Sequence, residues 1–461
     1  MSGRPDVDRI FRFLEENERL DPSVLERRCD DLLATQLDYL STRSVHYRVS
    51  LERIPERLSA RDRLLQMPLL DKETLLNRFD QIVTDPELRF TQVQAYLRDR
   101  ETVDRPWPNG DYMVVSTAGT TGKPGYFAYS RAEEAHIRAQ YLRFMNAVLS
   151  AISFKGALRT SAIIMTGTHM IGHKMMRSLP SEFVQIIPVM QEGQPISVKD
   201  MASRLRAFRP HVLTCFGTTL RMLADHKAEF PAFDWSPRAI ISTGATLDPE
   251  ARRRAIAAFP GVKIFDLYGS TDTGYIGWTC ERGGMHLNID CCRVEVLDQS
   301  GQPVPPGKQG LIHLTPLWHR TLPVARYRLG DLVSVGSDSC GCGRSLPLLA
   351  QLWGRENTLL YRAGLRPEPV SHGAIVELFE TTAGVRRFRL VQRSLTELEV
   401  EVVPLAREDD PEPELFRRLR AIFGPSAQVQ VRRVQDIAPH PVSGKLTPIE
   451  RLFSLDDGVS P

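Results

Sequence analysis

The stretch Ser116-Thr-Ala-Gly-Thr-Thr-Gly-Lys-Pro124 decides how the rest of the sequence is interpreted. Its two glycines let the backbone approach a ligand closely, its hydroxyls donate hydrogen bonds to oxygens, and its lysine adds a positive charge. This composition is typical of a loop that holds phosphate groups, and an ordinary polar hairpin turn is the alternative interpretation. The residues predicted to hold phosphate are Ser116, Thr117, Gly119, Thr120, Thr121, Gly122 and Lys123.

The spacing of this loop excludes a Walker A motif. Gly119 and Gly122 are only three positions apart, and Pro124 follows the lysine where that motif needs serine or threonine. The flanking segments 111–115 and 125–129 are predicted to be short strands. The loop is therefore expected to join one strand to another, without a helix starting at the lysine.

Composition places the chain among ordinary globular proteins. Of its 461 residues, 42% are hydrophobic and 25% charged, and the net charge is only +3. This balance gives no reason to expect nucleic acid or an acidic membrane as a partner. The sequence also lacks an apolar run long enough to span a membrane and a signal-peptide core. We therefore expect a cytoplasmic enzyme, and its state as a monomer or homodimer stays open.

The order of expected elements predicts an α/β fold. Residues 1–60 have helical periodicity, and strands alternate with helices between residues 161 and 265, which favours a mostly parallel, doubly wound sheet. From about residue 285 the pattern changes to short strands with Gly and Pro turns, which predicts a β-rich subdomain. The expected domains are a large N-terminal one at 1–353, a hinge at 354–357 and a small α+β one at 358–461.

Three further stretches follow in a fixed order at 265–274, 326–331 and 441–448. Together with the glycine loop they resemble the ordered motifs of the adenylate-forming superfamily, most closely its phenylacetate–CoA ligase branch, over residues 65–450. The resemblance implies activation of a carboxylic acid, aromatic in this branch, by ATP and Mg²⁺. Pyrophosphate is released, and the acyl group passes from AMP to coenzyme A. The small C-terminal domain is expected to be a mobile lid.

The resemblance also implies a set of residues that contact the nucleotide. Thr271 would bond the α-phosphate and Asp272 would hold Mg²⁺, although the family usually has glutamate at that position. Tyr268 would stack on adenine, Asp331 would bond the ribose, and Arg355 would reach ribose or phosphate. The remaining nucleotide contacts are predicted at Gly244, Ala245, Thr246, Asp266, Gly269 and Ser270.

Lys445 matches the lysine of the adenylating step, since a flexible ammonium can neutralise a carboxylate as it meets a phosphate. The hinge has Asn357 where the family usually has aspartate, and this departure leaves the acyl acceptor open. The alternatives are transfer to an amine, giving an amide, or release of the adenylate. A nucleotide-binding regulatory protein without chemistry is the non-enzymatic alternative, which an intact Lys445 disfavours.

Cysteine and histidine residues supply two further predictions. Cys280, His286, Cys340 and Cys342 offer three thiols and an imidazole, which suits a structural zinc site. Reduced thiols without metal are the alternative, and Cys291 or Cys292 could substitute for one ligand. His169 and His173 follow a strand end where family members line the acyl pocket, and a purely structural role is equally consistent with their position.

Overall fold

The computed structural model describes residues 6–108, 110–117, 124–166, 169–177, 180–191, 194–230, 233–244, 247, 249–298, 300–336, 339–365, 367–370, 375, 378–379, 381–437 and 449–453. The chain divides into two compact units. The first contains residues 1–329 and 333–352, and the second contains residues 330–332 and 353–461. The hinge at 354–357 and the domain roles stay predictions.

The first unit opens with a helical arm, as the periodicity of residues 1–60 predicts. Its helices begin at residues suited to that position: the Asp6 carboxylate accepts a hydrogen bond from the Arg9 amide, and Asp71 caps its helix through the Thr74 amide. The helices are α1 (Val7–Asn17), α2 (Pro22–Arg43), α3 (Val45–Leu51), α4 (Ala60–Gln66), α5 (Lys72–Asn77), α6 (Phe79–Ile82) and α7 (Phe90–Arg98), followed by the 3₁₀ turn η1 (Arg100–Thr102).

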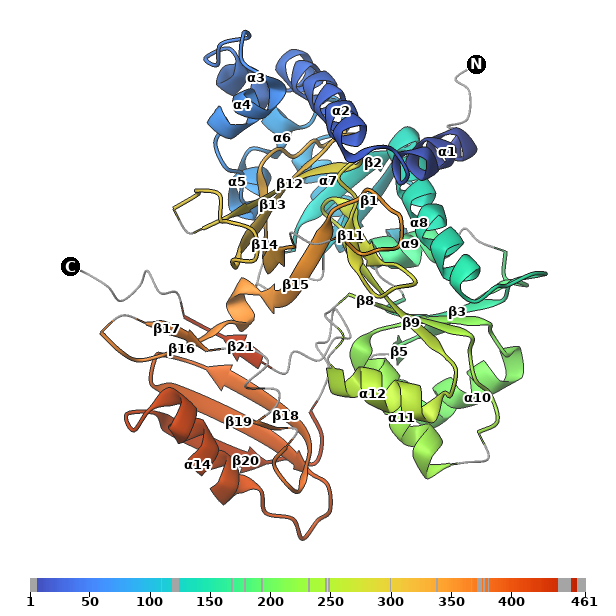
Figure 1. Cartoon of the computed structure of the whole chain (residues 1–461), viewed down its shortest axis with the longest axis vertical. Coiled ribbons are helices and arrows are strands. Elements are labelled where there is room, and N and C mark those ends of the chain that lie inside the picture. The colour runs from blue at the N-terminus through green and yellow to red at the C-terminus, as the bar shows by residue number, and fades with distance from the viewer. Residues whose placement is uncertain are drawn as a thin grey trace. The chain divides into compact units, whose positions relative to one another are not determined.

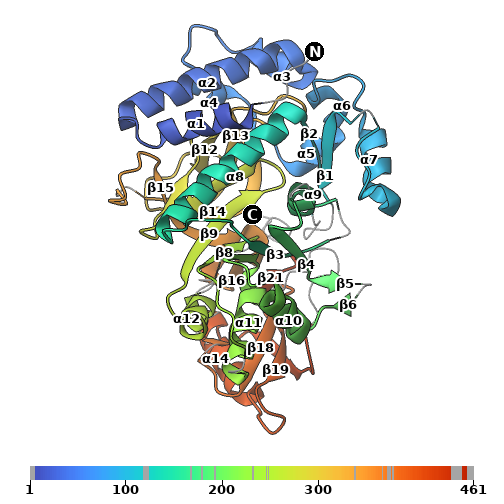
Figure 2. The same ribbon diagram turned by 90° about the vertical axis from the view of Figure 1, so that its right-hand side faces the viewer.

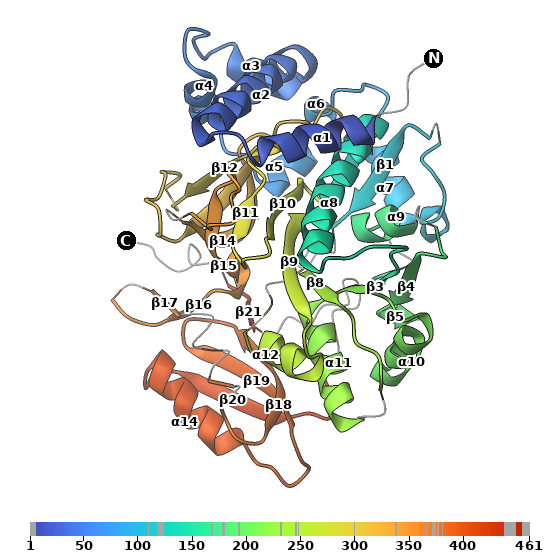
Figure 3. The ribbon, with the colours of Figure 1, turned by 45° about the vertical axis from the view of Figure 1, so that its right-hand side comes forward.

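A buried ion pair fixes the first helix to the body of the unit. Helix α8 (Arg131–Ala151) lies against α1, as Figures 2 and 3 show. From α8, the Arg143 guanidinium pairs with the Asp290 carboxylate at 2.7 Å and donates to the Leu14 carbonyl. The Asn17 amide donates to the same carboxylate at 3.1 Å. A buried ion pair is costly unless its remaining polar atoms are hydrogen-bonded. Helix α1 supplies two of these hydrogen bonds, from Leu14 and Asn17.

The two strands predicted around the glycine loop are present. Strand β1 (Tyr112–Ser116) and strand β2 (Tyr126–Ser130) pair in antiparallel register, with Ser116 opposite Tyr126. They form a two-stranded sheet of their own. Loop residues 118–123 between them lie outside the described residues.

The parallel half of the main sheet confirms the predicted α/β, doubly wound fold. Its strand order is β9-β8-β7-β3-β4, and the crossovers run through α9, α10, α11 and α12. Because such crossovers are right-handed, the helices after β4 cover one face, where α10, α11 and α12 lie together in Figure 1, and α9 covers the other. The elements are β3 (Thr160–Ile164), α9 (Ile171–Arg177), β4 (Val184–Pro188), α10 (Val198–Phe208), β7 (Val212–Cys215), α11 (Gly217–Glu229), β8 (Ala239–Thr243), α12 (Pro249–Ala258) and β9 (Lys263–Ser270).

The β-rich segment continues this sheet. Strand β10 pairs antiparallel with β9, and the order runs on through β11, β15, β14, β13 and β12 to give eleven strands. The expected subdomain is therefore the second half of one sheet, because β9 pairs with β8 along one edge and with β10 along the other. The strands are β10 (Gly274–Thr279), β11 (Met285–Leu287), β12 (Cys292–Leu297), β13 (Gly310–Pro316), β14 (Tyr327–Val335) and β15 (Leu348–Arg355); β5 (Met190–Gln191) and β6 (Gln194–Pro195) form a small hairpin.

Apolar side chains fill both faces of the parallel strands. Residues of α10, α11 and α12 pack with strand residues such as Ile163 and Leu213. On the other face, the Phe144 ring of α8 lies 6.4 Å from Phe265 and 6.0 Å from Trp278. These two layers fix the strand ends on which the candidate site is built.

The second unit is a small α+β assembly. The sequence pattern predicts strands at 386–392, 398–403 and 428–433 and a helix at 412–423, and all four elements are present. Its four-stranded sheet has the order β20-β19-β18-β21, with a separate β16-β17 hairpin. The sequence pattern also predicts a helix at 374–381, but most of these residues lie outside the described ones. The elements are η2 (Glu356–Thr358), β16 (Leu360–Arg362), β17 (Glu368–Val370), β18 (Val385–Gln392), β19 (Glu397–Pro404), α14 (Glu412–Phe423), β20 (Gln428–Arg433) and β21 (Ile449–Arg451).

Candidate active site

The parallel strands bring several predicted residues to one edge of the sheet. Strands β3 and β7 are neighbours whose crossovers leave in opposite directions, and ligands of such sheets bind outside the carboxyl ends of the strands at this point. At the same edge Thr243 pairs with Leu267, and its hydroxyl donates to the Leu267 carbonyl at 3.1 Å. Gly244 therefore follows β8 beside Tyr268. Ala245 and Thr246 lie outside the described residues.

The base of the glycine loop is held at the same place. The Ser116 amide donates to the His169 carbonyl at 3.0 Å, and the Thr117 amide donates to the Gly125 carbonyl at 2.9 Å. A Cβ added to Gly125 would lie 2.8 Å from the Phe127 ring, so only glycine fits there. The predicted phosphate contacts at Gly119, Thr120, Thr121, Gly122 and Lys123 lie outside the described residues.

One cation at this loop is absent from the sequence-based prediction. The Lys72 ammonium, from α5, donates to the Thr117 hydroxyl at 3.4 Å. Lys72 directly follows Asp71, the N-cap of α5. Nothing in the local pattern indicates that α5 reaches a loop 45 residues away.

The turn between β9 and β10 carries the two residues predicted to meet the α-phosphate and Mg²⁺. The Ser270 hydroxyl accepts from the Asp272 and Thr273 amides, both at 3.2 Å. The Thr271 carbonyl accepts from the Tyr129 hydroxyl. The Asp272 carboxylate is buried and accepts from the Tyr327 hydroxyl at 2.8 Å. Mg²⁺ is commonly held by one or two carboxylates together with substrate phosphates, and a fixed buried carboxylate fits that pattern.

The segment before this turn lies within strand β9. Residues 266–270 belong to β9, and Tyr268 pairs with Gly277 of β10. Tyr268 is buried among core residues, and Gly269 approaches Tyr275 so closely that an added Cβ would lie 3.1 Å from its ring. Stacking of Tyr268 on adenine stays a prediction.

Asp266 has a partner within its own chain. Its carboxylate pairs with the Arg252 guanidinium of α12, and its amide donates to the Thr279 hydroxyl at 2.7 Å. Burial raises the pKa of the Asp266 carboxyl, against the opposing effect of Arg252. This pair ties α12 to β9, and a nucleotide contact at Asp266 stays a prediction.

Asp331, predicted to bond the ribose, meets Arg355, predicted to reach ribose or phosphate, in the second unit. The Arg355 Nε lies 2.8 Å from the Asp331 Oδ1. Gly330, with φ of 85°, has the left-handed conformation that glycine adopts readily, and the Arg355 Nη1 would lie 3.8 Å from a Cβ at Gly330. A carboxylate and a guanidinium at one point form a site suited to a diol and a phosphate.

His169 and His173 are both buried, and His169 has partners of its own. The Nε2 of His169 lies 3.2 Å from the Thr102 hydroxyl, and its ring packs 5.1 Å from Tyr96. Burial lowers the pKa of His169 to about 4, aided by the charge of Lys174. His169 is therefore neutral at pH 7 and joins the strand end to η1. Its place in an acyl pocket stays a prediction.

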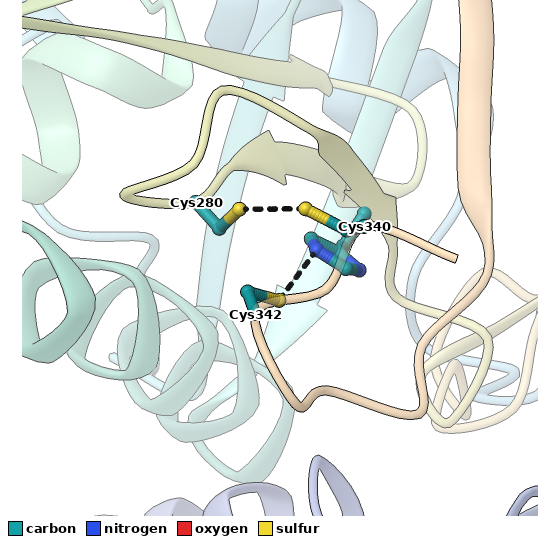
Figure 4. Close-up of side chains that lie close together, drawn as sticks. Cys280, Cys340 and Cys342 are labelled. Atoms are coloured by element: carbon teal, nitrogen blue, oxygen red, sulfur yellow. Dashed lines mark hydrogen bonds between the residues drawn. The ribbon is translucent and has the colours of Figure 1, made fainter. Parts of the chain in front are cut away.

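Four predicted metal ligands lie together at the other end of β10. The ligand atoms of Cys280, His286, Cys340 and Cys342 are all within 4.8 Å of one another. The Cys280 and Cys340 sulfurs are 3.3 Å apart, and Cys342 Sγ lies 3.2 Å from His286 Nε2, as the labelled thiols and dashed lines in Figure 4 show. Three thiols and one imidazole are a usual ligand set of tetrahedral structural zinc sites, so the chemistry of this donor set fits zinc.

Neighbouring groups orient these ligands. The His286 Nδ1 lies 2.8 Å from the Leu346 carbonyl, a contact that directs Nε2 toward the thiols. A Cβ at Gly284 would lie 2.6 Å from the Cys340 sulfur, so this position requires glycine. Cys291 and Cys292, proposed as substitutes, do not belong to the cluster within the described residues.

Two predicted features of the second unit have no side-chain description. Lys445 lies outside the described residues, and the Asn357 side chain of η2 is not described either.

Within the described part of the chain, no helix combines the length and the apolar character that crossing a membrane requires.

A doubly wound sheet whose carboxyl edge holds the base of a glycine-rich hairpin and a turn with a buried aspartate is suited to binding a nucleotide. The chain belongs to the family of AMP-binding enzymes, whose model matches residues 52–315. It is similar to the phenylacetate-coenzyme A ligase of Thermus thermophilus, with 28% identity over 304 residues that cover 63% of this chain and 65% of that protein. It is also similar to an uncharacterized acyl-CoA ligase of Bacillus subtilis, with 21% identity over 215 residues, 44% of this chain and 41% of that protein. The chain thus spans less than two thirds of the length of these relatives.

Solved structures share the fold. A 2-hydroxyisobutyryl-CoA ligase in complex with R3-HIB-AMP superimposes with a TM-score of 0.71 at 17% identity, covering 96% of this chain and 92% of that one. The amide bond synthetase McbA from Marinactinospora thermotolerans gives a TM-score of 0.51 at 18% identity, over 72% of this chain and 66% of that one.

Proposed function

We propose that this protein activates a carboxylic acid with ATP, releases pyrophosphate, and transfers the acyl group from the resulting adenylate to coenzyme A. The observation that carries the proposal is the turn at 270–273, where a buried carboxylate and a threonine stand beside the glycine-loop hairpin. Membership in the AMP-binding family supports it. The name of the Thermus thermophilus relative supports an aromatic acid as substrate.

In the first half-reaction a carboxylate oxygen attacks the α-phosphorus of ATP. The new bond joins that oxygen to phosphorus, and the bond to the bridging oxygen of pyrophosphate breaks with its electron pair. Both reactants are anions, so catalysis depends on positioning and charge neutralisation. Thr271 would donate to the α-phosphate, Lys445 would neutralise the encounter, and the glycine loop with Lys72 would hold the outgoing phosphates.

Mg²⁺, when bound, would neutralise the phosphate oxygens of ATP. Asp272 would be its protein ligand, fixed by the Tyr327 hydroxyl. Asp331 would accept from the ribose hydroxyls, with Arg355 oriented by the same carboxylate.

In the second half-reaction the coenzyme A sulfur would attack the acyl carbon of the adenylate. The thioester bond forms as the bond from that carbon to the AMP oxygen breaks, and the thiol proton passes to solvent. Rotation of the second unit, as a lid, would separate the two steps.

Transfer to an amine is the second candidate, and the fold shared with an amide bond synthetase favours it. One experiment separates the possibilities: pyrophosphate release is measured across aromatic and aliphatic acids, alone, with coenzyme A, and with amines. Acid-dependent release with thioester formation supports the proposal, and amide formation supports the alternative. No release with any acid would favour a regulatory nucleotide-binding protein.

We propose also that Cys280, His286, Cys340 and Cys342 hold a structural zinc ion. The proposal rests on the proximity of the four ligand atoms and on the orientation of His286. The metal would join the turn after β10 to the segment before β15, with no part in the chemistry. The four protein ligands would fill all four coordination positions, as is usual for structural sites.

A further inference from the structure

The Asp272 turn is held by two buried tyrosine hydroxyls from different strands. Tyr129, on β2, donates to the Thr271 carbonyl, and Tyr327, at the start of β14, donates to the Asp272 carboxylate at 2.8 Å. Strand β2 also leads out of the glycine loop. The turn is therefore fixed to the hairpin at its backbone and to β14 at its side chain.

Tyr327 is itself immobile. Its ring is 1% exposed and packs edge-on against Phe127 of β2 at 6.5 Å. The Tyr327 side chain is therefore restricted to one rotamer, which also fixes the position of its hydroxyl, because a closely packed core leaves little room for others. The hydrogen bond to Asp272 joins a neutral donor to a carboxylate, and such charge-assisted bonds are stronger than neutral ones.

An aspartate needs more positional control than a glutamate in the same place. Its carboxylate is one methylene closer to the backbone, so it cannot reach a metal by changing rotamer along a longer chain. Mg²⁺ requires near-octahedral oxygens at about 2.1 Å and tolerates little misplacement. A donor fixed in the core can hold the short carboxylate at the required angle.

We propose that Tyr327 is a positioning residue that holds Asp272 for the metal of the metal–ATP complex; this inference rests on the proposed function. Removal of the hydroxyl takes one fixed hydrogen-bond donor away from the carboxylate, so its position becomes less well defined. The expected loss is about tenfold in metal affinity, the scale of one hydrogen bond to a charged group. The rate at saturating metal changes much less, because Tyr327 itself does not touch the reacting atoms.

The test compares Tyr327→Phe with wild type and with Tyr47→Phe. The control removes another buried hydroxyl of the same unit, one that bonds the backbone at Pro323 and Ala325. Phenylalanine keeps the ring, so the core stays filled, and the thermal midpoint checks this for both variants. Mn²⁺ binding in the presence of a non-hydrolysable ATP analogue is measured by electron paramagnetic resonance, and the magnesium dependence of pyrophosphate release is measured beside it.

Tyr327→Phe should weaken Mn²⁺ binding and raise the magnesium requirement by the same factor, while Tyr47→Phe leaves both unchanged. In an Asp272→Glu background the Tyr327→Phe change should have little effect, since the longer glutamate side chain can reach the metal without the hydrogen bond from Tyr327. If Asp272→Asn weakens Mn²⁺ binding and Tyr327→Phe does not, positioning by Tyr327 is wrong while the metal role of Asp272 stands. If Asp272→Asn also leaves binding unchanged, the metal role itself is wrong.

Discussion

Arg355 and Asp331 form an ion pair in which the guanidinium Nε lies 2.8 Å from the carboxylate. The carboxylate side chain is 9% exposed and the guanidinium 47%, so the acid sits inside and the base faces outward. Such a pair presents a hydrogen-bond acceptor and a donor side by side. Both residues belong to the second unit, which is the proposed lid.

We expect Arg355→Ala to raise the KM for ATP about tenfold, because Asp331 loses the charge-assisted bond that orients it. Arg355→Lys should recover only part of the loss, since an ammonium lacks the planar fork of guanidinium. Arg362→Ala is the matched control, since it breaks the exposed pair with Glu368 in the same unit. Equal ATP affinity in Arg355→Ala and Arg362→Ala would contradict the assignment of Arg355.

Lys445→Ala should abolish pyrophosphate release from acid and ATP, because no other ammonium is predicted to neutralise the approaching carboxylate. The same variant should still form thioester from synthetic acyl adenylate and coenzyme A. Measuring both half-reactions separately checks this, with Lys308→Ala as the exposed control. Loss of both half-reactions to the same extent, with an unchanged thermal midpoint, would count against the assignment.

The purified protein should contain about one zinc ion per chain by elemental analysis. Cys340→Ser should lose the metal and lower the thermal midpoint, whereas Cys29→Ala, a buried thiol outside the cluster, should retain it. Because thiolate ligands must lose their protons, zinc should leave at low pH or with strong chelators. A metal-free protein after expression with ample zinc would refute the site.

Acid should destabilise the first unit through histidines that stay neutral in the folded chain, among them His136 and His319. Burial lowers the pKa of His136 to about 4 and that of His319 to about 3. Each therefore stays neutral in the folded chain while the unfolded chain takes up protons below about 6.5. The free energy of unfolding should fall as pH drops from about 6.5 toward 4, and His319→Gln should flatten that slope by about one proton. Denaturant titrations across this range measure the slope, and parallel slopes for both proteins would contradict the prediction.

Local patterns predicted the elements well because caps and periodicity act within a few residues. Ser130 and Glu133 have the sequence spacing of a capping box, Asp71 is a residue type that favours an N-cap, and both caps are present. The four zinc-type ligands were also predictable, because thiol and imidazole spacing reflects ligand chemistry. The exclusion of Cys291 and Cys292 required the fold, since both are buried elsewhere.

Contacts between distant residues could not be predicted in this way. Tyr327 and Asp272 are separated by 55 positions, and Lys72 and Thr117 by 45. No local pattern encodes which strand lies beside which, so neither pair is visible before the sheet order is known. The same holds for the extension of β9 through Ser270, because its second partner strand follows later in the chain.

The buried Arg143–Asp290 pair has a consequence for how far the chain can be shortened. The family match begins only at residue 52, so a truncation guided by it would discard α1, α2 and α3. That cut would remove the Leu14 carbonyl, which accepts from Arg143, and the Asn17 side-chain amide, which donates to Asp290. The buried ion pair would then be exposed to water on the side where α1 had packed. Residues before position 52 therefore shield the Arg143–Asp290 ion pair from water. A chain that lacks them would be a poor candidate for expression.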